Sequence, residues 1–150
     1  MVRNRGLEFS LSGQIAQGVN LVVGSVYLDA QVSGEEVDLG LIGKKPVGTF
    51  KLHNVANLNW NLPWHKPLTL TARFESTSNR TANAANTFVI PARSVTSLGA
   101  RYRLTIGGKP ILIRGSVDNI FNKFGWNVGG SGFFVPNGSR RYSLTLATDL

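Results

Sequence analysis

Hydrophobic and polar residues alternate along most of this chain with a period of two, not the period of about 3.6 that marks an amphipathic helix. In the segment LEFSLSGQI, Leu7 and Phe9 share one side. Glu8 and Ser10 fall on the other side. Because successive side chains of a β-strand point to opposite faces, this pattern predicts strands with one apolar and one polar face. The strands predicted in this way are residues 7–15, 68–75, 96–106 and 140–150.

Three further strands are predicted at 19–32, 47–60 and 110–121, which makes seven strands and no helix. Residues 19–32 are apolar on both sides, and we predict Leu21, Val23 and Tyr27 on the apolar face. The other two segments alternate more clearly. In residues 47–60 the apolar set is predicted to be Phe50, Leu52, Ala56, Leu58 and Trp60, with Lys51, His53, Asn57 and Asn59 opposite.

The connections between these strands alternate between short and long. Tight turns are predicted at 16–18, 61–67 and 107–109, and long loops at 31–46, 76–94 and 122–139. An up-and-down barrel of the outer membrane sorts its connections in this way, with short turns at one end and long loops at the other.

On most of the predicted strands the apolar face carries no charge, and the charged residues lie on the polar face. They are Glu8, Lys51, His53, Arg73, Glu75, Arg101, Arg103, Arg114, Asp118, Arg141 and Asp149. Such a face meets water in a soluble antiparallel sheet, and it lines an aqueous lumen in a membrane barrel. Alternation alone leaves both open. Strands of about ten residues suit a tilted membrane crossing. Aromatic residues near the predicted strand ends suit interfacial girdles; they are Phe9, Tyr27, Trp60, Phe74, Phe121 and Tyr142.

Composition excludes several classes of protein. The 150 residues suffice for one domain, and no run of 18 apolar residues could form a membrane-spanning helix. The absence of cysteine excludes disulfides and thiolate metal sites. The net charge of +8 comes from dispersed cations, so nucleic-acid binding is not expected. The residues after Met1 lack the apolar centre of a secretory signal peptide.

The carboxyl-terminal third carries the motifs of a known family. Residues 99–126 resemble the penultimate strand of the TonB-dependent outer-membrane receptors, whose motif Val-x-Asn-Leu-Phe-Asp-Lys-x-Tyr stands here as residues 117–126, VDNIFNKFGW. Residues 135–141, VPNGSRR, resemble the entry to the family's last strand. That strand resembles the outer-membrane insertion signal, although Leu150 stands where the family usually ends in Phe. Matching upstream pieces lie at residues 6–9, 26–30 and 40–46.

This resemblance implies an all-β fold, an antiparallel up-and-down transmembrane β-barrel. Residues 1–150 would form the seven C-terminal strands of a barrel of about 22, with the plug domain outside this sequence. The implied function is TonB-dependent uptake of iron–siderophore complexes in the bacterial outer membrane. The implied partners are a ferric siderophore, outer-membrane lipid and lipopolysaccharide, and TonB through the plug. The alternative is a small self-contained β-barrel or β-sandwich that binds a partner without transport.

Two groups of residues are candidates for ligand binding. Lumenal Arg73, Arg101, Arg103 and Arg114, with Lys51, would attract an anionic chelate or pair with charges of the plug. In the last long loop, the aromatic side chains would stack on a siderophore or simply pack the loop; they are Phe124, Trp126, Phe133 and Phe134. The loop cations Arg80 and Arg93 would contact the ligand or lipopolysaccharide phosphate, or remain in solvent. Asp118 and Asn119 are predicted to cap a turn.

Catalysis is not expected. The two histidines, His53 and His65, lack partners at the spacing of a catalytic triad or a metal site. An enzyme built on a small barrel is therefore the least favoured interpretation. No cofactor is predicted, because iron would arrive already chelated as the transported ligand. The GGSG segment at 129–132 lacks the lysine of a phosphate-binding loop and is predicted to be a mobile loop.

Overall fold

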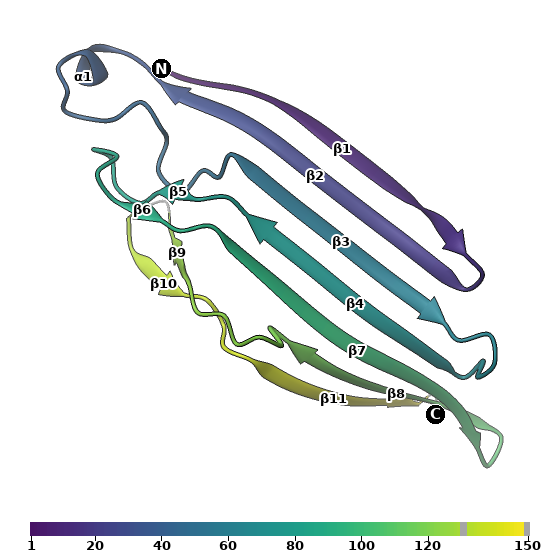
Figure 1. Cartoon of the computed structure of the whole chain (residues 1–150). Helices are drawn as coiled ribbons and strands as arrows, with labels where there is room; N and C mark the ends of the chain where they lie inside the picture. The colour runs from purple at the N-terminus through teal and green to yellow at the C-terminus, as the bar shows by residue number, and fades with distance from the viewer. Residues whose placement is uncertain (130–131, 149–150) are drawn as a thin grey trace.

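A single antiparallel sheet of seven strands dominates the computed structural model, which describes residues 1–129 and 132–148. The strands lie side by side in chain order (Figure 1). They are β1 (Val2–Ala16), β2 (Val19–Val32), β3 (Leu52–Asn61), β4 (Leu68–Thr77), β7 (Arg93–Ile106), β8 (Lys109–Asp118) and β11 (Arg141–Thr148). Each corresponds to a predicted strand, so the all-β antiparallel architecture is confirmed.

The strand boundaries differ from the predictions where pairing overrides the local pattern. β1 begins at Val2 because its pairing with β2 continues as far as Val32. β3 begins only at Leu52, since Phe50 forms a bridge with Arg80 instead of joining the main sheet. β8 ends at Asp118 because the next residue, Asn119, has a φ of 52°, which a strand cannot accommodate.

Short turns join the strands at one end of the sheet. The β7–β8 turn has Gly107 and Gly108 at φ 60° and 79°, the pair of positive values that a type I′ hairpin turn requires. In the β1–β2 turn, Gly18 has a φ of 75°, and its carbonyl accepts a hydrogen bond from the Asn61 amide of β3. The third turn connects β3 and β4 through residues 62–67. All three predicted turns are confirmed.

The long connections gather at the opposite end (Figure 1). They contain short elements that were not predicted: α1 (Glu35–Asp38), a hairpin of β5 (Arg80–Thr81) and β6 (Val89–Ile90), and a hairpin of β9 (Trp126–Val128) and β10 (Phe134–Pro136). Such one-turn and two- or three-residue elements are too short to produce a recognisable sequence period. The predicted sorting of turns and loops to opposite ends is confirmed.

Strand register confirms the predicted faces. Leu21, Val23 and Tyr27 of β2 lie opposite Leu58, Ala56 and Leu52 of β3. Phe50 and Lys51 are the exceptions, because both precede β3 and the alternation does not extend to them. The Phe50 ring lies 5.0 Å from the His53 ring, so its predicted place on the apolar face, opposite His53, is wrong. The Lys51 Nζ atom lies 5.4 Å from the centroid of the Tyr27 ring, so its predicted place on the polar face is also wrong.

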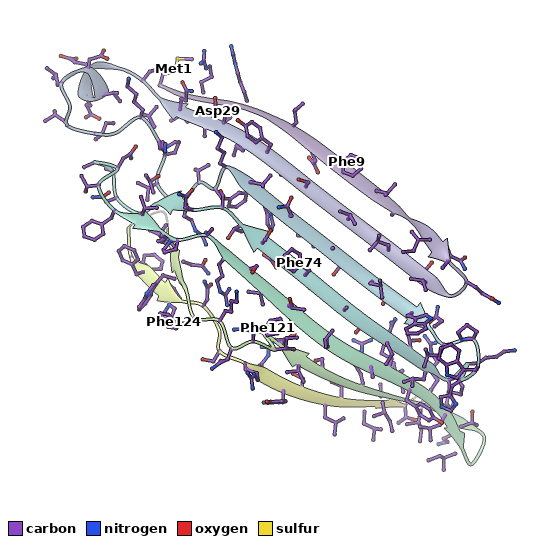
Figure 2. The ribbon with its side chains drawn as sticks, viewed as in Figure 1. Met1, Phe9, Asp29, Phe74, Phe121 and Phe124 are labelled. Carbon is purple, nitrogen blue, oxygen red and sulfur yellow. The ribbon has the colours of Figure 1, made fainter. Side chains whose placement is uncertain are left out.

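The apolar face of this sheet is not covered by a second layer in the described part of the chain. Side chains project from both sides of the one sheet (Figure 2), and the exposed fraction is 78% for Leu7 and 81% for Leu144. The buried hydrophobic residues among those described are only Leu62, Ala82 and Ile90. A water-soluble domain of this size normally buries about two thirds of its surface. No helix within residues 1–129 and 132–148 has the length and apolar character needed to cross a membrane.

Candidate ligand-binding site

The four predicted lumenal arginines do share the polar face. Arg101 of β7 lies directly opposite Arg114 of β8, and Arg103 follows two residues along β7. Arg73 of β4 lies opposite Ser97, on the same face of the sheet. The four arginines thus concentrate positive charge on the polar face, although like charges directly opposite each other in a sheet are destabilising.

Two of these arginines have partners within the sheet. Arg73 Nη2 donates to Glu75 Oε2 at 3.0 Å, and Arg101 Nη2 donates to Asn59 Oδ1 at 3.0 Å. Arg103 and Arg114 form no ion pair with any described residue. Their charges remain uncompensated within the part of the chain that the structure describes.

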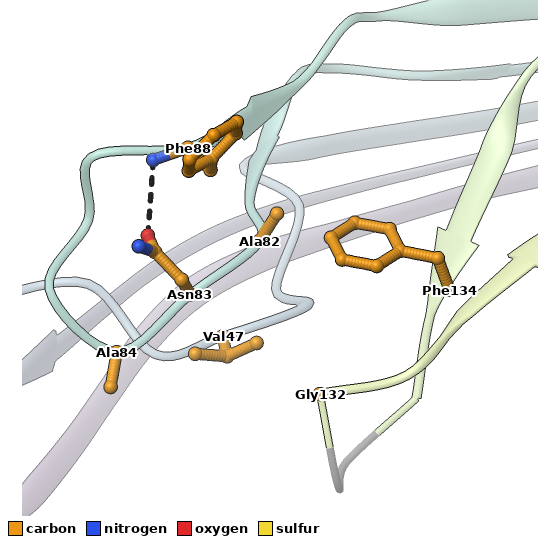
Figure 3. Close-up of a pocket in the computed structure, with 7 residues that line it drawn as sticks. All are labelled: Val47, Ala82, Asn83, Ala84, Phe88, Gly132 and Phe134. Carbon is orange, nitrogen blue, oxygen red and sulfur yellow. Dashed lines mark hydrogen bonds between the residues drawn. The ribbon is translucent and has the colours of Figure 1, made fainter.

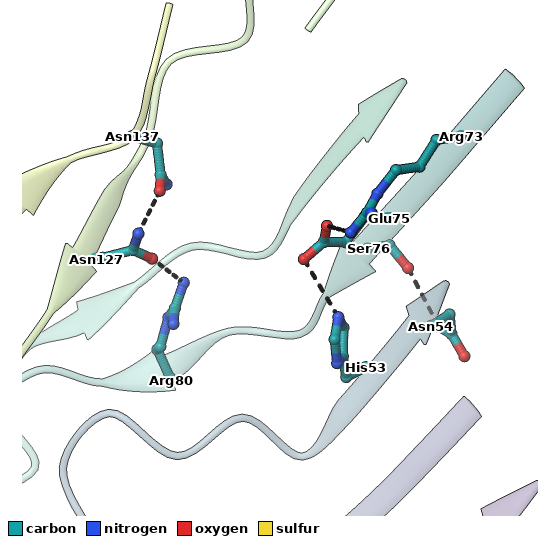
Figure 4. Close-up of polar contacts among 8 residues, drawn as sticks. All are labelled: His53, Asn54, Arg73, Glu75, Ser76, Arg80, Asn127 and Asn137. Carbon is teal, nitrogen blue, oxygen red and sulfur yellow. Dashed lines mark hydrogen bonds and ion pairs between the residues drawn. The ribbon is translucent and has the colours of Figure 1, made fainter. Parts of the chain in front are cut away.

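At the loop end of the polar face lies a hollow of about 270 Å³, lined by strand and loop residues together. We call it the polar hollow, and its lining is Phe50, His53, Glu75, Thr77, Arg80, Arg93, Val95, Asn127 and Asn137. At its floor, His53 Nε2 and Glu75 Oε1 are 3.3 Å apart, and Arg73 pairs with the other oxygen of the same carboxylate (Figure 4). The β3 and β4 strands thus supply a paired carboxylate to this hollow.

Loop residues close the other side of the polar hollow. Arg80 Nη2 donates to Asn127 Oδ1 at 3.0 Å, and Asn127 donates in turn to Asn137 (Figure 4). Arg93 Nη2 donates to the Lys123 carbonyl at 3.0 Å. The Nε atoms of Arg80 and Arg93 are buried and have no acceptor. These two half-buried cations therefore line the polar hollow, each held by a neutral partner.

A second hollow, of about 460 Å³, adjoins the first and shares Phe50 and Arg80 with it. We call it the lysine hollow because Lys44, Lys45 and Lys51 line it, together with Asp29. Backbone contacts hold the lysine loop in place: the Lys44 carbonyl accepts from Val32, and Lys45 exchanges two hydrogen bonds with the Asn86 side chain. The two hollows together form a cationic mouth at the loop end.

The predicted loop aromatics do not form one cluster. Phe124 and Trp126 contact each other edge to face, with ring centroids 5.2 Å apart. Phe133 lies against Gly129, where a Cβ atom would be 2.5 Å from its ring. Phe134 lies elsewhere, in an apolar hollow of about 460 Å³ formed with Val47, Ala82, Asn83, Ala84, Phe88 and Gly132 (Figure 3). These aromatics therefore pack three separate places in the loops.

Asn119 caps the turn after β8, as predicted. Its Oδ1 accepts from the Lys123 amide at 2.9 Å, and its Nδ2 donates to the carbonyls of Lys123 and Gly138. Asp118 does not cap this turn, because it is the last residue of β8 and pairs with Arg141 of β11 at 2.9 Å.

Two further expectations concern metal binding and the glycine-rich loop. No group of three or more His, Asp or Glu side chains suited to a metal ion occurs among the described residues. The predicted mobile loop includes Gly130 and Ser131, which lie outside the described residues, as do Asp149 and Leu150.

Lys44 and Lys45 are the functional candidates that sequence reasoning missed. Both lie in the predicted loop at 31–46, where no alternation indicates the direction of a side chain. The adjacent pair of lysines before a proline was the only available signal, and it does not specify a position relative to the sheet.

Comparisons with known proteins support this architecture. The family model described as TonB dependent receptor-like, beta-barrel, matches residues 1–120. The chain is 26% identical over 149 residues to the ferrichrome receptor FcuA of Yersinia enterocolitica. The aligned region covers 98% of this chain and 20% of that protein. The relative is thus named as a receptor and not as an enzyme.

Solved structures give the same result. The ferric preacinetobactin receptor BauA of Acinetobacter baumannii superposes with a TM-score of 0.89 at 26% identity, over 99% of this chain and 22% of that one. The siderophore receptor PiuA of Acinetobacter baumannii shares the fold, with a TM-score of 0.80 at 17% identity over 98% of this chain and 22% of that one. The chain spans about a fifth of the length of these relatives. It belongs to the family of TonB-dependent receptor β-barrels.

Proposed function

We propose that this chain is a membrane-spanning barrel segment of an outer-membrane receptor that takes up ferric siderophores with energy from TonB. The observation that carries the proposal is the division of one uncovered sheet into an exposed apolar face and a cationic polar face. An apolar face without a protein partner is stable against lipid, and a polar face of the same sheet then lines an aqueous lumen.

The loop end gives this segment its role in capture. The cationic mouth opens where the polar face meets the long loops, so a ligand arriving from outside would meet it first. The arginines farther along the polar face, Arg73, Arg101, Arg103 and Arg114, would then contact the ligand or the plug. We propose that the plug and the contact with TonB come from parts of the receptor outside residues 1–150.

The test is iron uptake by cells that express the receptor containing this chain. The host lacks its own siderophore receptors, and the iron is radiolabelled and supplied on hydroxamate, catecholate and carboxylate siderophores. We expect the receptor in the outer-membrane fraction and uptake of at least one complex. The same uptake should disappear in a matched host without TonB, because transport through a plugged barrel requires energy.

Two results would contradict the proposal. One is a receptor that reaches the outer membrane but transports none of the three classes of complex. The other is uptake that is equal with and without TonB, since this would indicate passive diffusion through an open pore.

A further inference from the structure

We infer that the ligand of the cationic mouth is a ferric chelate with net negative charge, and not an electroneutral one. The inference rests on the proposed function and specifies its substrate class. The names of the relatives do not specify this charge, and one of them is a ferrichrome receptor. Three singly charged hydroxamates neutralise a ferric ion. Three doubly charged catecholates, or citrate carboxylates in excess, leave the complex negative.

The charges that line the mouth are unequal. Five cations line its two hollows; these mouth cations are Lys44, Lys45, Lys51, Arg80 and Arg93. Only two carboxylates accompany them, those of Asp29 and Glu75. Because clefts lined by one sign of charge focus the electric field, this mouth raises the local concentration of anions.

The two carboxylates do not neutralise the mouth cations. Glu75 is paired with Arg73 and His53, neither of which is a mouth cation. Asp29 accepts a hydrogen bond from the neutral amide of Gln31 at 3.1 Å. The ion pairs of the described residues therefore leave all five mouth cations without an acidic partner.

The two arginines of the mouth are oriented by neutral groups. Arg80 donates to the amide oxygen of Asn127, and Arg93 donates to the backbone carbonyl of Lys123. These contacts fix the guanidinium groups but leave their charge uncompensated. Each also retains a buried Nε with no acceptor. Anionic oxygens of a chelate are the groups that guanidinium binds most strongly. A neutral chelate could accept a hydrogen bond from Arg80 or Arg93, but it would gain no attraction between opposite charges.

The experiment compares three radiolabelled complexes in cells that express the whole receptor. Ferrichrome is the neutral probe, and ferric enterobactin and ferric citrate are the anionic probes. We expect uptake of at least one anionic complex, little uptake of ferrichrome, and an initial rate that falls as ionic strength rises, because salt screens the field of the mouth.

A double variant tests the mouth directly. Lys44→Gln/Lys45→Gln removes two mouth charges, whereas the hydrogen bonds of this loop use backbone atoms and are retained. We expect its KM for the anionic complex to rise about threefold to tenfold with little change in maximal rate. The matched control is Arg3→Gln, an exposed cation of β1 outside both hollows, and its KM should equal that of the unchanged receptor.

The outcomes separate the inference from the proposed function. Preference for ferrichrome overturns the inference and leaves the receptor function intact. A KM for the anionic complex that changes neither with ionic strength nor in the double variant has the same consequence. Failure to transport any of the three complexes from the outer membrane overturns the proposed function, and the inference falls with it.

Discussion

Asn119 is among the most buried polar residues of the described chain, with 4% of its surface exposed. It occupies the left-handed region at φ 52°, which asparagine adopts more readily than most other residues. Its side chain connects the end of β8 to Lys123 and, through the carbonyl of Gly138, to the segment that enters β11. One residue thus fixes where a strand ends and how the following loop returns.

We predict that Asn119→Ala destabilises the protein by about 3 kcal/mol, because it removes the hydrogen bonds of this buried side chain to Lys123 and Gly138 and places alanine at a positive φ. Asn119→Gly is the control, since it removes the same hydrogen bonds but tolerates the backbone angle, and it should cost less. The measurement is urea unfolding of the protein in lipid vesicles. An alanine variant as stable as the original would contradict this role.

The sequence predicted this role for Asn119 but assigned the same role to its neighbour Asp118. The difference lies in the pairing of β8 with β11, which places Asp118 opposite Arg141. Strand register between distant segments is a property of the folded sheet, so residue chemistry alone could not distinguish the two.

At the scale of the element, β7 and β8 show why small residues occur within these strands. Gly99 lies opposite Thr71 on one side and Ser116 on the other. A Cβ atom there would be 2.8 Å from the Thr71 hydroxyl and 3.1 Å from the carbonyl oxygen of Gly115. The space at residue 99, between Thr71 and Gly115, is therefore too small for a side chain.

We predict that Gly99→Val lowers the free energy of unfolding by about 1–3 kcal/mol, because overpacking forces backbone shifts. The control is Gly13→Val in β1, where no atom lies within 4 Å of the added Cβ and a β-branched residue favours the strand. Unfolding midpoints in the same vesicles measure both variants. Equal midpoints for the two valine variants would show that this close approach is not a constraint.

Alternation predicted the strands well, because each period-two segment pairs with a neighbour of the same pattern. Loop elements such as β5, β6, β9 and β10 were missed, because each has only two or three residues, too few to show a period. The cationic mouth depends on contacts between loops, such as those of Arg80 with Asn127 and of Lys45 with Asn86. The sequence therefore predicted the polar-face arginines of the site and named Lys51 as a candidate cation, but it did not predict Lys44 and Lys45.

At the scale of the whole molecule, the exposed apolar face is the feature that most constrains the environment of this protein. Opposite-facing neighbours on β11 illustrate it: Leu144 and Leu146 lie on the apolar face, and Ser143 and Thr145 on the polar face. In water such a surface would promote association between molecules. Against hydrocarbon the same surface is stable, since the charged residues beside it, Arg114, Asp118 and Arg141, lie on the other face.

We predict that Leu144→Arg impairs assembly in the membrane, because a cation on the lipid-facing side of a barrel costs about 2–4 kcal/mol near the midplane. Ser143→Arg is the matched control on the lumenal side of the same strand and should be tolerated. The fraction of folded receptor in outer-membrane preparations, measured by its faster electrophoretic migration without boiling, distinguishes them. If the sheet were instead exposed to water on its apolar face, Leu144→Arg would fold as well as the original and be more soluble. The direction of the Leu144→Arg effect therefore decides between lipid and water as the solvent of this face.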